Sequence, residues 1–444
     1  VGFFTDAYDL FAITLVAEML GYVYIYDGIL PVNIELWLKV SAAVGTLVGQ
    51  IVFGILADRI GRKRMYGVEL WIIIVATIFT TLSGSGPYLN VFGLIIFWRV
   101  ILGLGVGGDY PLSAIITSEF ATKERRGSMM AAVFAMQGFG IFASILVAVI
   151  TLSAAKNDLY EHKNFDGVDY VWRIILGLDS VELPRSSWED FKQYFSKWKN
   201  AKILLGTCGA WFCIDVAYYG IGLNNTIFFR NALQYKSLPG IITNKHDGNF
   251  DAWTPLFHAS LGNLIITLLG TIPGYWVSVY FIDRWGRRRI QFMGFAVLTV
   301  LFIVFGAAFH QIKDTSIFLF GAMFTLTQFF FNFGPNTTTF VVPGEVFPTR
   351  YRSTCYGISA AVGKLGAIFA QIAFYKLKNI GGKTTTDNTE YSANAAFIDK
   401  LLLGCAVFMI FGVIFTCFIP ETKGKSLEEL SNEDQTNFIR QIEN

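Results

Sequence analysis

The chain has 444 residues, of which 53% are hydrophobic, 16% aromatic and only 15% charged, and its formal charge is +2 at pH 7. Soluble domains carry charges on roughly a quarter of their residues, so this composition excludes an ordinary water-soluble protein. The small net charge gives no reason to expect a nucleic-acid partner.

Apolar runs of about 20 residues, long enough to cross a bilayer as helices, recur along the chain. We expect eleven such spans, near residues 3–25, 36–57, 66–84, 90–118, 128–153, 202–228, 256–282, 290–309, 316–342, 354–376 and 396–419. A twelfth begins at Tyr170 ("YVWRIILGL") but meets polar residues after nine positions. We therefore expect the sequence to lack a segment near Leu178 and Asp179, the alternative being a genuine half-span. The chain also opens at Val1 within an apolar run, which suggests that the N-terminus lies further upstream.

Basic residues are concentrated in alternate connections between these spans. The connection "SGSGPYLN" (83–90) has no Lys or Arg, whereas other connections are rich in them: "DRIGRKR" (58–64), "TKERRG" (122–127), 185–202, "DRWGRRR" (283–289) and "TRYR" (349–352). Cytoplasmic loops of membrane proteins carry the excess of Lys and Arg. We therefore expect the basic connections and both termini to face the cytoplasm.

Two motifs recur at nearly the same spacing. "DRIGRK", which starts at Asp58, returns as "DRWGRR", which starts at Asp283. "SEFATKERRG" with Glu119 returns as "GEVFPTRYRS" with Glu345, and the two spacings differ by a single position. This agreement predicts two related halves of six spans, residues 1–178 and 201–419, with a linker at 179–200 and a tail at 420–444. Such an organisation is that of a major facilitator transporter, an all-α membrane protein.

The repeated charges predict a latch between neighbouring helix ends at the inner loops. A latch that breaks and forms again can bias two conformations. Charges that serve only to orient the protein in the membrane would explain the arginines but not the paired acids. The expected latch residues are Asp58, Arg59, Arg62, Glu119, Asp283, Arg284, Arg287 and Glu345.

Three stretches, "GFFTDAYDLF" (2–11), "GGDYPLSA" (107–114) and "PETKGKSLEEL" (420–430), resemble the phosphate:proton symporters of fungi and plants, within the major facilitator superfamily. The resemblance runs along the whole chain except near the sixth span. Sugar porters share "PETKG" but usually carry a Gln-Gln pair in the seventh span, where this chain has "WFCIDVAYYG" (211–220). The resemblance implies a twelve-helix fold, a plasma-membrane location, import of inorganic phosphate with protons, and no cofactor or metal. It also implies that phosphate is bound by Tyr110, Gln137, Trp211, Asp215, Tyr219 and Asn336.

Charged side chains at membrane depth are costly and usually face a cavity. Six of them fall in the middle of expected spans: Asp6, Asp9, Arg99, Asp109, Asp215 and Lys364. We expect Asp6, Asp9 and Asp109 to carry protons. Arg99 is expected to pair with one of these acids, and Asp215 to neutralise Lys364. Buried salt bridges that only hold the helices together are the alternative.

The repeat spacing identifies the same region without reference to any family. Tyr110 shifted by the repeat spacing reaches Pro335 or Asn336, and Gln137 shifted in the same way reaches a position beside Lys364. Transporters of this organisation bind their substrates between the halves near the bilayer midplane. We expect this site there.

The fourth expected span contains four glycines and a proline, which predict close packing and a loosened turn. The missing side chains would let another helix or the substrate approach. Pro111 removes an N–H group from the turn that holds Asp109 and Tyr110. A packing seam of small residues is the alternative. The glycines are Gly103, Gly105, Gly107 and Gly108.

Other functional classes fit the sequence less well. A channel would not need a two-half repeat with inner-loop latches, and a membrane enzyme would need a nucleophile–base or metal grouping, which the sequence does not show. Two alternatives stay open. One is a proton symporter for another small anion or a sugar, and the other is a sensor that binds phosphate without transporting it.

Overall fold

The computed structural model describes residues 2–25, 30–65, 68–84, 90–154, 169, 172–173, 176, 198–225, 253–348, 351–381, 398–425 and 427. The segment near Leu178 and Asp179, where we expect residues to be missing, lies outside this part of the chain. So do most of the expected linker and most of the expected tail.

Every regular element in the described residues is helical. The first half contributes α1 (Gly2–Tyr24), α2 (Val32–Ile60), α3 (Arg62–Met65), α4 (Val68–Thr81), α5 (Val91–Phe120) and α6 (Arg126–Ala154). The second half contributes α9 (Trp198–Gly222), α11 (Trp253–Ile266), the π-helical turn η2 (Thr267–Thr271), α12 (Ile272–Trp285), α13 (Arg287–Ala307), α14 (Phe309–Thr315), α15 (Ile317–Asn332), α16 (Pro335–Val346), α17 (Arg352–Gly381) and α18 (Ile398–Thr416). Eight helical segments of this part of the chain are long and apolar enough to cross a membrane.

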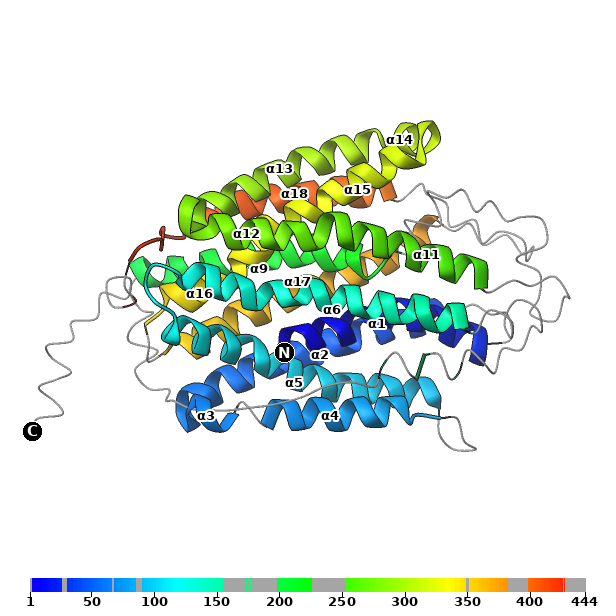
Figure 1. Ribbon diagram of the computed structural model, residues 1–444, viewed down its shortest axis with the longest axis horizontal. Helices are drawn as coiled ribbons and strands as arrows, with labels where there is room; N and C mark the ends of the chain where they lie inside the picture. The colour runs from blue at the N-terminus through cyan, green and yellow to red at the C-terminus, as the bar shows by residue number, and fades with distance from the viewer. Residues whose placement is uncertain are drawn as a thin grey trace, which may run out of the picture.

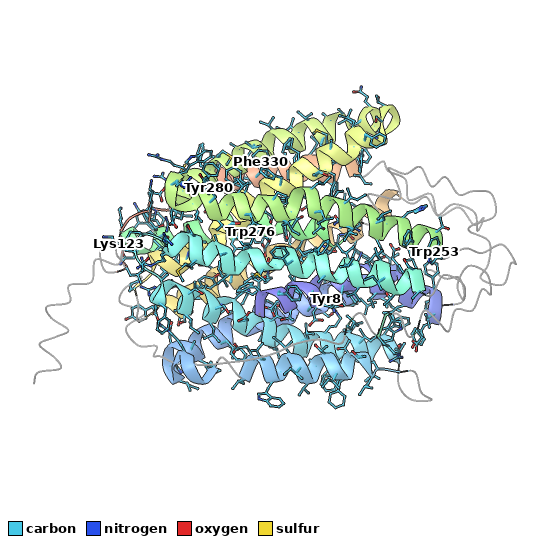
Figure 2. All side chains as sticks on the ribbon, in the orientation of Figure 1. Tyr8, Lys123, Trp253, Trp276, Tyr280 and Phe330 are labelled. Carbon is cyan, nitrogen blue, oxygen red and sulfur yellow. The ribbon has the colours of Figure 1, made fainter. Side chains whose placement is uncertain are left out.

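The helices run side by side along the long axis of the molecule (Figure 1). We call the end at which α2, α5 and α12 finish the latch end; α3 and α16 lie there, and α11 begins at the opposite, far end (Figure 1). Helix α2 packs against α17, and α6 packs against α12, so both helix pairs join the two halves. Large apolar side chains such as Trp276 and Tyr280 are exposed on the side of the bundle (Figure 2). A surface of this kind suits contact with lipid.

Glycines allow α5 to pack closely against two neighbours. A Cβ atom at Gly103 or Gly107 would collide with the backbone of α2, and one at Gly105 would collide with the backbone of α4. The expected loosened turn does not form, because α5 continues as an α-helix through Pro111. Close packing along both sides of α5 supports a continuous helix despite the hydrogen bond that the proline removes.

The corresponding helix of the second half is interrupted instead. The expected span at 316–342 is divided into α15 and α16, with Phe333 and Gly334 between them. The Asn332 carbonyl, which the break would leave without a helical partner, accepts hydrogen bonds from Ser278 Oγ and Thr337 Oγ1, both at 2.7 Å. Irregular backbone at membrane depth is tolerated where the surrounding protein satisfies its polar groups in this way.

Candidate functional site

A chain of hydrogen bonds crosses between the halves in the middle of the bundle. Gln137 Nε2 on α6 donates to the Tyr110 hydroxyl on α5 at 2.7 Å, and Gln137 Oε1 accepts from the Tyr275 hydroxyl on α12 at 3.2 Å. Asn336, in the first turn of α16, donates to the same Tyr275 hydroxyl at 3.0 Å and to Asn332 Oδ1 at 2.8 Å. All five side chains are buried. Their donors and acceptors are therefore used by one another and become available to a ligand only if the ligand replaces these bonds.

A buried ion pair lies beside this chain. Lys364 Nζ on α17 donates to Asp215 Oδ2 and to the Tyr219 hydroxyl on α9, both at 2.9 Å. The Tyr110 ring of the other half lies beside this pair, with its centroid 6.5 Å from that of Trp211, one turn before Asp215, and 5.2 Å from Lys364 Nζ. The predicted pairing of Lys364 with Asp215 is confirmed.

The structure therefore gathers the predicted substrate residues at one interface between the halves. Two of these six residues, Tyr110 and Gln137, come from the first half, and the other four, Trp211, Asp215, Tyr219 and Asn336, come from the second. Lys364 adds a cation to the set. Hydroxyl, indole and amide groups can donate to the oxygens of an anion, and the carboxylate can accept from a hydroxyl group of the same anion. The set is suited to a small hydroxylated anion.

Neutralising one member of the ion pair is expected to destabilise the protein more than neutralising both. Lys364→Met or Asp215→Asn alone leaves a buried charge without its partner, which costs about 3–5 kcal/mol. The double variant, which we call the neutral-pair variant, removes both charges and should recover most of that loss. Thermal unfolding in detergent measures the difference.

Glu35→Gln is the control for this experiment. Glu35 is 21% exposed and pairs with Lys39, which keeps a second contact to Asn224 Oδ1 at 3.0 Å. Lys39 itself is only 5% exposed, but because Glu35 reaches solvent and Lys39 keeps the Asn224 contact, breaking this pair should cost less than breaking the fully buried Lys364–Asp215 pair. If the neutral-pair variant unfolds at no higher temperature than the less stable of the two single variants, the pairing is contradicted.

Two carboxyl groups meet deep in the first half. Asp109 Oδ1 accepts from Ser113 Oγ at 2.5 Å, and the Asp6 carboxyl group on α1 lies near enough to act on Asp109. An ionised carboxylate can only accept hydrogen bonds. Two buried carboxylates this close repel each other when both are ionised, so the pair favours a proton on one of them and is a place where a proton can reside.

Arg99 lies near a different acid. Its guanidinium donates to the backbone oxygens of Leu38 at 3.3 Å and Asp9 at 3.5 Å, and the charge of Asp9 acts on it. Ten helical residues, about 15 Å, separate Arg99 from Asp109 along α5. Of the three candidate partners, the structure places Asp9 at Arg99, whereas Asp109 is associated with Asp6.

At the latch end, two aspartates bind the helix N-termini of the opposite half. Asp58 on α2 accepts from the backbone N–H groups of Ser353 at 3.3 Å and Thr354 at 2.5 Å, at the start of α17. Asp283 on α12 accepts from the Ser128 backbone N–H at 2.7 Å, and from its hydroxyl, at the start of α6. A helix N-terminus has unsatisfied N–H groups and the positive end of the helix dipole, and both attract a carboxylate. The two repeated aspartates thus form a crossed pair of contacts between the halves.

Arginines support each aspartate from its own half. Arg287 donates to both Glu345 oxygens, at 2.7 and 2.9 Å, and pairs with Asp283 at 2.8 Å. Thr422, beyond α18, donates to Glu345 Oε2 at 2.5 Å. Bidentate arginine–carboxylate pairs fix the orientation of both side chains, so Asp283 is held towards α6.

The equivalent charges of the first half form a contact that spans the two halves. Glu119 accepts from Arg62 of its own half and from Arg352 of the other half, the latter at 3.3 Å. Arg59 and Arg284 are exposed, and the Arg284 guanidinium lies over an aromatic ring of its own helix. Arg352 is therefore a latch residue that the sequence-based set did not include.

Sequence reasoning also missed polar residues of the central site. The Tyr275 hydroxyl joins Gln137 to Asn336, and the buried Tyr218 lies beside Tyr219, with ring centroids 5.4 Å apart. Tyr275 is the repeat equivalent of the buried Gln50, so the repeat spacing could have drawn attention to it. Within the described residues, no group of three or more His, Cys, Asp or Glu side chains is arranged to hold a metal ion.

Comparisons with known proteins agree with this organisation. The family model described as "Sugar (and other) transporter" matches residues 1–188 and 256–433. A repressible high-affinity phosphate permease of Neurospora crassa is 40% identical, and the match covers 98% of this chain and 85% of that protein. The inorganic phosphate transporter PHO84 of Saccharomyces cerevisiae is also 40% identical, over 97% of this chain and 82% of its own length.

Solved structures share the fold at low sequence identity. The major facilitator proton:xylose symporter XylE, bound to a bromodeoxyglucose, superposes with a TM-score of 0.65 at 18% identity over 97% of this chain and 96% of its own. A partially occluded inward-open XylE from E. coli gives a TM-score of 0.63 at 16% identity, over 96% and 97%. The predicted major facilitator fold is confirmed. The chain belongs to the sugar (and other) transporter family, in the group that contains the inorganic phosphate transporters of fungi and plants.

Proposed function

We propose that this protein imports inorganic phosphate together with protons, by alternating access of one site between its two halves. The observation that best supports the proposal is the central site itself, in which Lys364, Asp215 and neutral donors from both halves meet around Tyr110. The relatives at 40% identity are named as phosphate permeases and transporters, which supports the choice of substrate.

Phosphate would enter this site by replacing bonds that the side chains now make with one another. Tyr110, Gln137 and Asn336 would turn their donors from the internal chain to the phosphate oxygens. Lys364 supplies the positive charge that a desolvated anion requires. Asp215 accepts from a P–OH group, so the same carboxylate that neutralises Lys364 also recognises a protonated phosphate.

The Asp6–Asp109 contact supports proton coupling. Loss of its proton leaves two carboxylates in contact, which repel each other and favour separation of α1 from α5. A change in this contact therefore alters the packing of the helix that carries Tyr110. Asp9 and Arg99 lie nearer the far end and form a second titratable group in the proton pathway of this proposal.

Alternating access requires that contacts at both ends can open. The crossed aspartates close the latch end, while at the far end Tyr375 donates to Asn33 Oδ1 at 2.5 Å and Trp253 donates to the Leu152 carbonyl at 2.8 Å. Each of these contacts joins a helix of one half to a helix of the other. In the proposed cycle one set breaks while the other is kept, so that the central site faces one side at a time.

We place the protein in the plasma membrane with both termini in the cytoplasm. The Lys and Arg residues at the latch end support this orientation, because cytoplasmic loops hold the excess of positive charge. The latch end is then the cytoplasmic gate, and the far end is the outer gate.

Uptake of labelled phosphate into proteoliposomes, with an imposed pH gradient and a clamped membrane potential, tests the function. An inside-alkaline gradient should drive accumulation, and a protonophore should abolish it. A phosphate sensor would bind phosphate but show no uptake or counterflow. A symporter for another solute would show uptake of sulfate or a sugar that excess phosphate does not inhibit.

A further inference from the structure

A cavity lies between the halves, on the far-end side of the central site. Its free volume is about 40 Å³, it is partly open to the surroundings, and α1, α6, α9, α11, η2 and α15 contribute to its lining. We call it the outer cavity. A single buried water needs about 10–15 Å³ by the same measure, so the cavity has room for roughly three water molecules or for one small anion that has lost most of its water.

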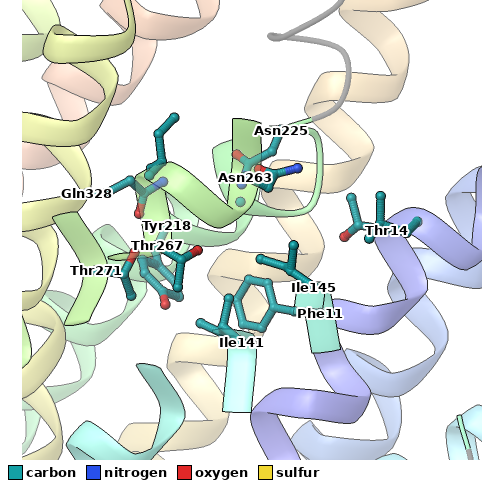
Figure 3. Close-up of a pocket in the computed structure, with 13 residues that line it drawn as sticks. Phe11, Thr14, Ile141, Ile145, Tyr218, Asn225, Asn263, Thr267, Thr271 and Gln328 are labelled. Carbon is teal, nitrogen blue, oxygen red and sulfur yellow. The ribbon is translucent and has the colours of Figure 1, made fainter. Parts of the chain in front are cut away.

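The outer cavity is lined by neutral polar side chains, and none of its lining residues is charged. Its main polar lining residues are Thr14, Asn225, Asn263, Thr267, Thr271 and Gln328. Asn225 and Asn263 gather at one end of the cavity, and Phe11 and Ile141 at the other (Figure 3). The two ends therefore offer hydrogen-bonding groups and an apolar wall, respectively.

Some of these polar groups have no partner within the described residues. The Thr14 hydroxyl oxygen is buried without a hydrogen bond, on a residue that is only 6% exposed, and so is the Asn225 side-chain oxygen. An unsatisfied buried hydroxyl or amide costs about 1–3 kcal/mol. Thr14 belongs to the first half and Asn225 to the second. Both groups would regain that free energy by hydrogen-bonding a ligand that has both donors and acceptors.

Phe11 separates the outer cavity from the central site. Its ring stacks on Tyr219 at a centroid distance of 6.0 Å and an interplanar angle of 18°, and it meets Tyr218 edge-on, also at 6.0 Å. On the other side of the cavity, Thr267 and Thr271 begin and end the π-helical turn. Such turns are often found at functional sites, because they realign the side chains on either side of them.

We propose that the outer cavity is a subsite that holds dihydrogen phosphate before it passes Phe11 to the central site; this rests on the proposed function. Amides and hydroxyls both donate to P–O oxygens and accept from P–OH groups. Because no cation lines this cavity, the anion binds there more weakly than beside Lys364. The gradient in affinity directs phosphate inward without trapping it at the outer cavity.

Protection of an engineered cysteine tests the subsite directly. Ile145→Cys places a thiol in the lining without removing a polar group, in a chain whose exposed Cys417 is replaced by serine. The neutral-pair variant serves as background, because it lacks the charges of the central site. Inorganic phosphate should still slow the reaction of this thiol with a small methanethiosulfonate, roughly threefold or more at saturating concentration.

Thr14→Val combined with Asn263→Leu should remove the protection. The same variant with an otherwise intact site should lower kcat/KM for phosphate uptake roughly tenfold, the effect of losing hydrogen bonds to a charged ligand. Thr14→Ser keeps the hydroxyl and should retain the wild-type value. Ser153→Cys, exposed and two turns further along α6, is the control thiol and should not be protected.

The outcomes separate the two proposals. If the wild-type protein transports phosphate but the thiol of Ile145→Cys is not protected, or if kcat/KM is unchanged in Thr14→Val with Asn263→Leu, the subsite is wrong and the proposed function stands. If the thiol of Ile145→Cys does not react at all, the uptake measurement decides alone. If the wild-type protein does not transport phosphate, the proposed function is wrong and the subsite fails with it.

Discussion

Asp109→Asn is expected to abolish the accumulation of phosphate driven by a pH gradient, while phosphate binding stays close to that of the wild type. Asparagine keeps the size of the side chain and an acceptor for Ser113, so the hydrogen bond at this position is retained without a carboxyl group. The helix contacts are preserved, but the group no longer gains or loses a proton during the cycle. Binding and the proton-driven step are thereby separated.

The size of the effect follows from the energy of a proton gradient. A difference of one pH unit provides about 1.4 kcal/mol per proton, which sustains a roughly tenfold concentration ratio for each coupled proton. Proteoliposomes of the wild type should reach at least that ratio, and those of Asp109→Asn should stop at equal concentrations inside and outside. Counterflow of labelled phosphate, which needs no gradient, should persist in the variant.

Glu69→Gln is the matched control. Glu69 is a buried carboxylate on α4 that packs against Gly108 of α5, and it lies outside the central site. Removing its charge should leave the accumulation ratio unchanged. Undiminished accumulation by Asp109→Asn would show that Asp109 has a structural role only, and loss of counterflow together with accumulation would show that it is needed for binding as well.

The central site was largely predictable because membrane depth makes charges costly and the repeat fixes positions. Asp215 and Lys364 lie on different helices, 149 residues apart, yet each needs a counter-charge in a low-dielectric interior, and each is the other's partner. Asn336 was found from the spacing between the two halves. Tyr275 was not predicted, since a hydroxyl on an otherwise apolar helix has little influence on hydropathy, and only its repeat equivalence to Gln50 marks it.

The helix breaks were harder to predict, because they depend on packing as well as on local sequence. Pro111 and Pro335 lie close to equivalent positions in the repeat, but only Pro335 follows a break. Gly294 of α13 leaves room for the displaced chain, since a Cβ atom there would lie 2.5 Å from the Pro335 ring. Along α5, Gly105 and Gly107 instead bring α4 and α2 into close backbone contact. The local sequences also differ, since Pro335 follows Gly334 and a Gly-Pro pair is typical of turns.

The outer cavity and the crossed latch show two further limits of sequence reasoning. Neutral polar residues such as Thr14 and Asn263 are common in membrane helices, and only the folded structure shows that they line the same cavity. The repeated Asp58 and Asp283 predicted a latch, but their partners are backbone N–H groups, which every residue except proline has. Backbone N–H partners of this kind can be identified only once the structure shows which helix begins beside each aspartate.

Selectivity between phosphate and sulfate is expected to rest on Asp215. The two anions are similar in size, but dihydrogen phosphate offers two O–H donors and sulfate near neutral pH offers none. Facing sulfate, the Asp215 carboxylate would lose a hydrogen bond and repel the anion. Sites that hydrogen-bond a hydroxyl group of their substrate reject analogues without it by roughly 10⁴-fold, and like-charge repulsion adds to this discrimination. Arsenate, with the same O–H pattern as phosphate, should compete with it well.

Asp215→Asn should reduce the preference for phosphate over sulfate to roughly 10²-fold, because the amide oxygen still accepts from P–OH while the repulsion is lost. Lys364 then meets sulfate without a competing carboxylate, which favours the more highly charged anion. Competition measured by isothermal titration calorimetry at pH 6, well below the unfolding temperature of the variant, gives both affinities. Glu69→Gln removes a buried charge away from the ligand and should keep the wild-type ratio. A wild-type protein that binds sulfate as tightly as phosphate would contradict the role of Asp215 as an acceptor, and an unchanged ratio in Asp215→Asn would show that the discrimination arises from the neutral donors around Tyr110.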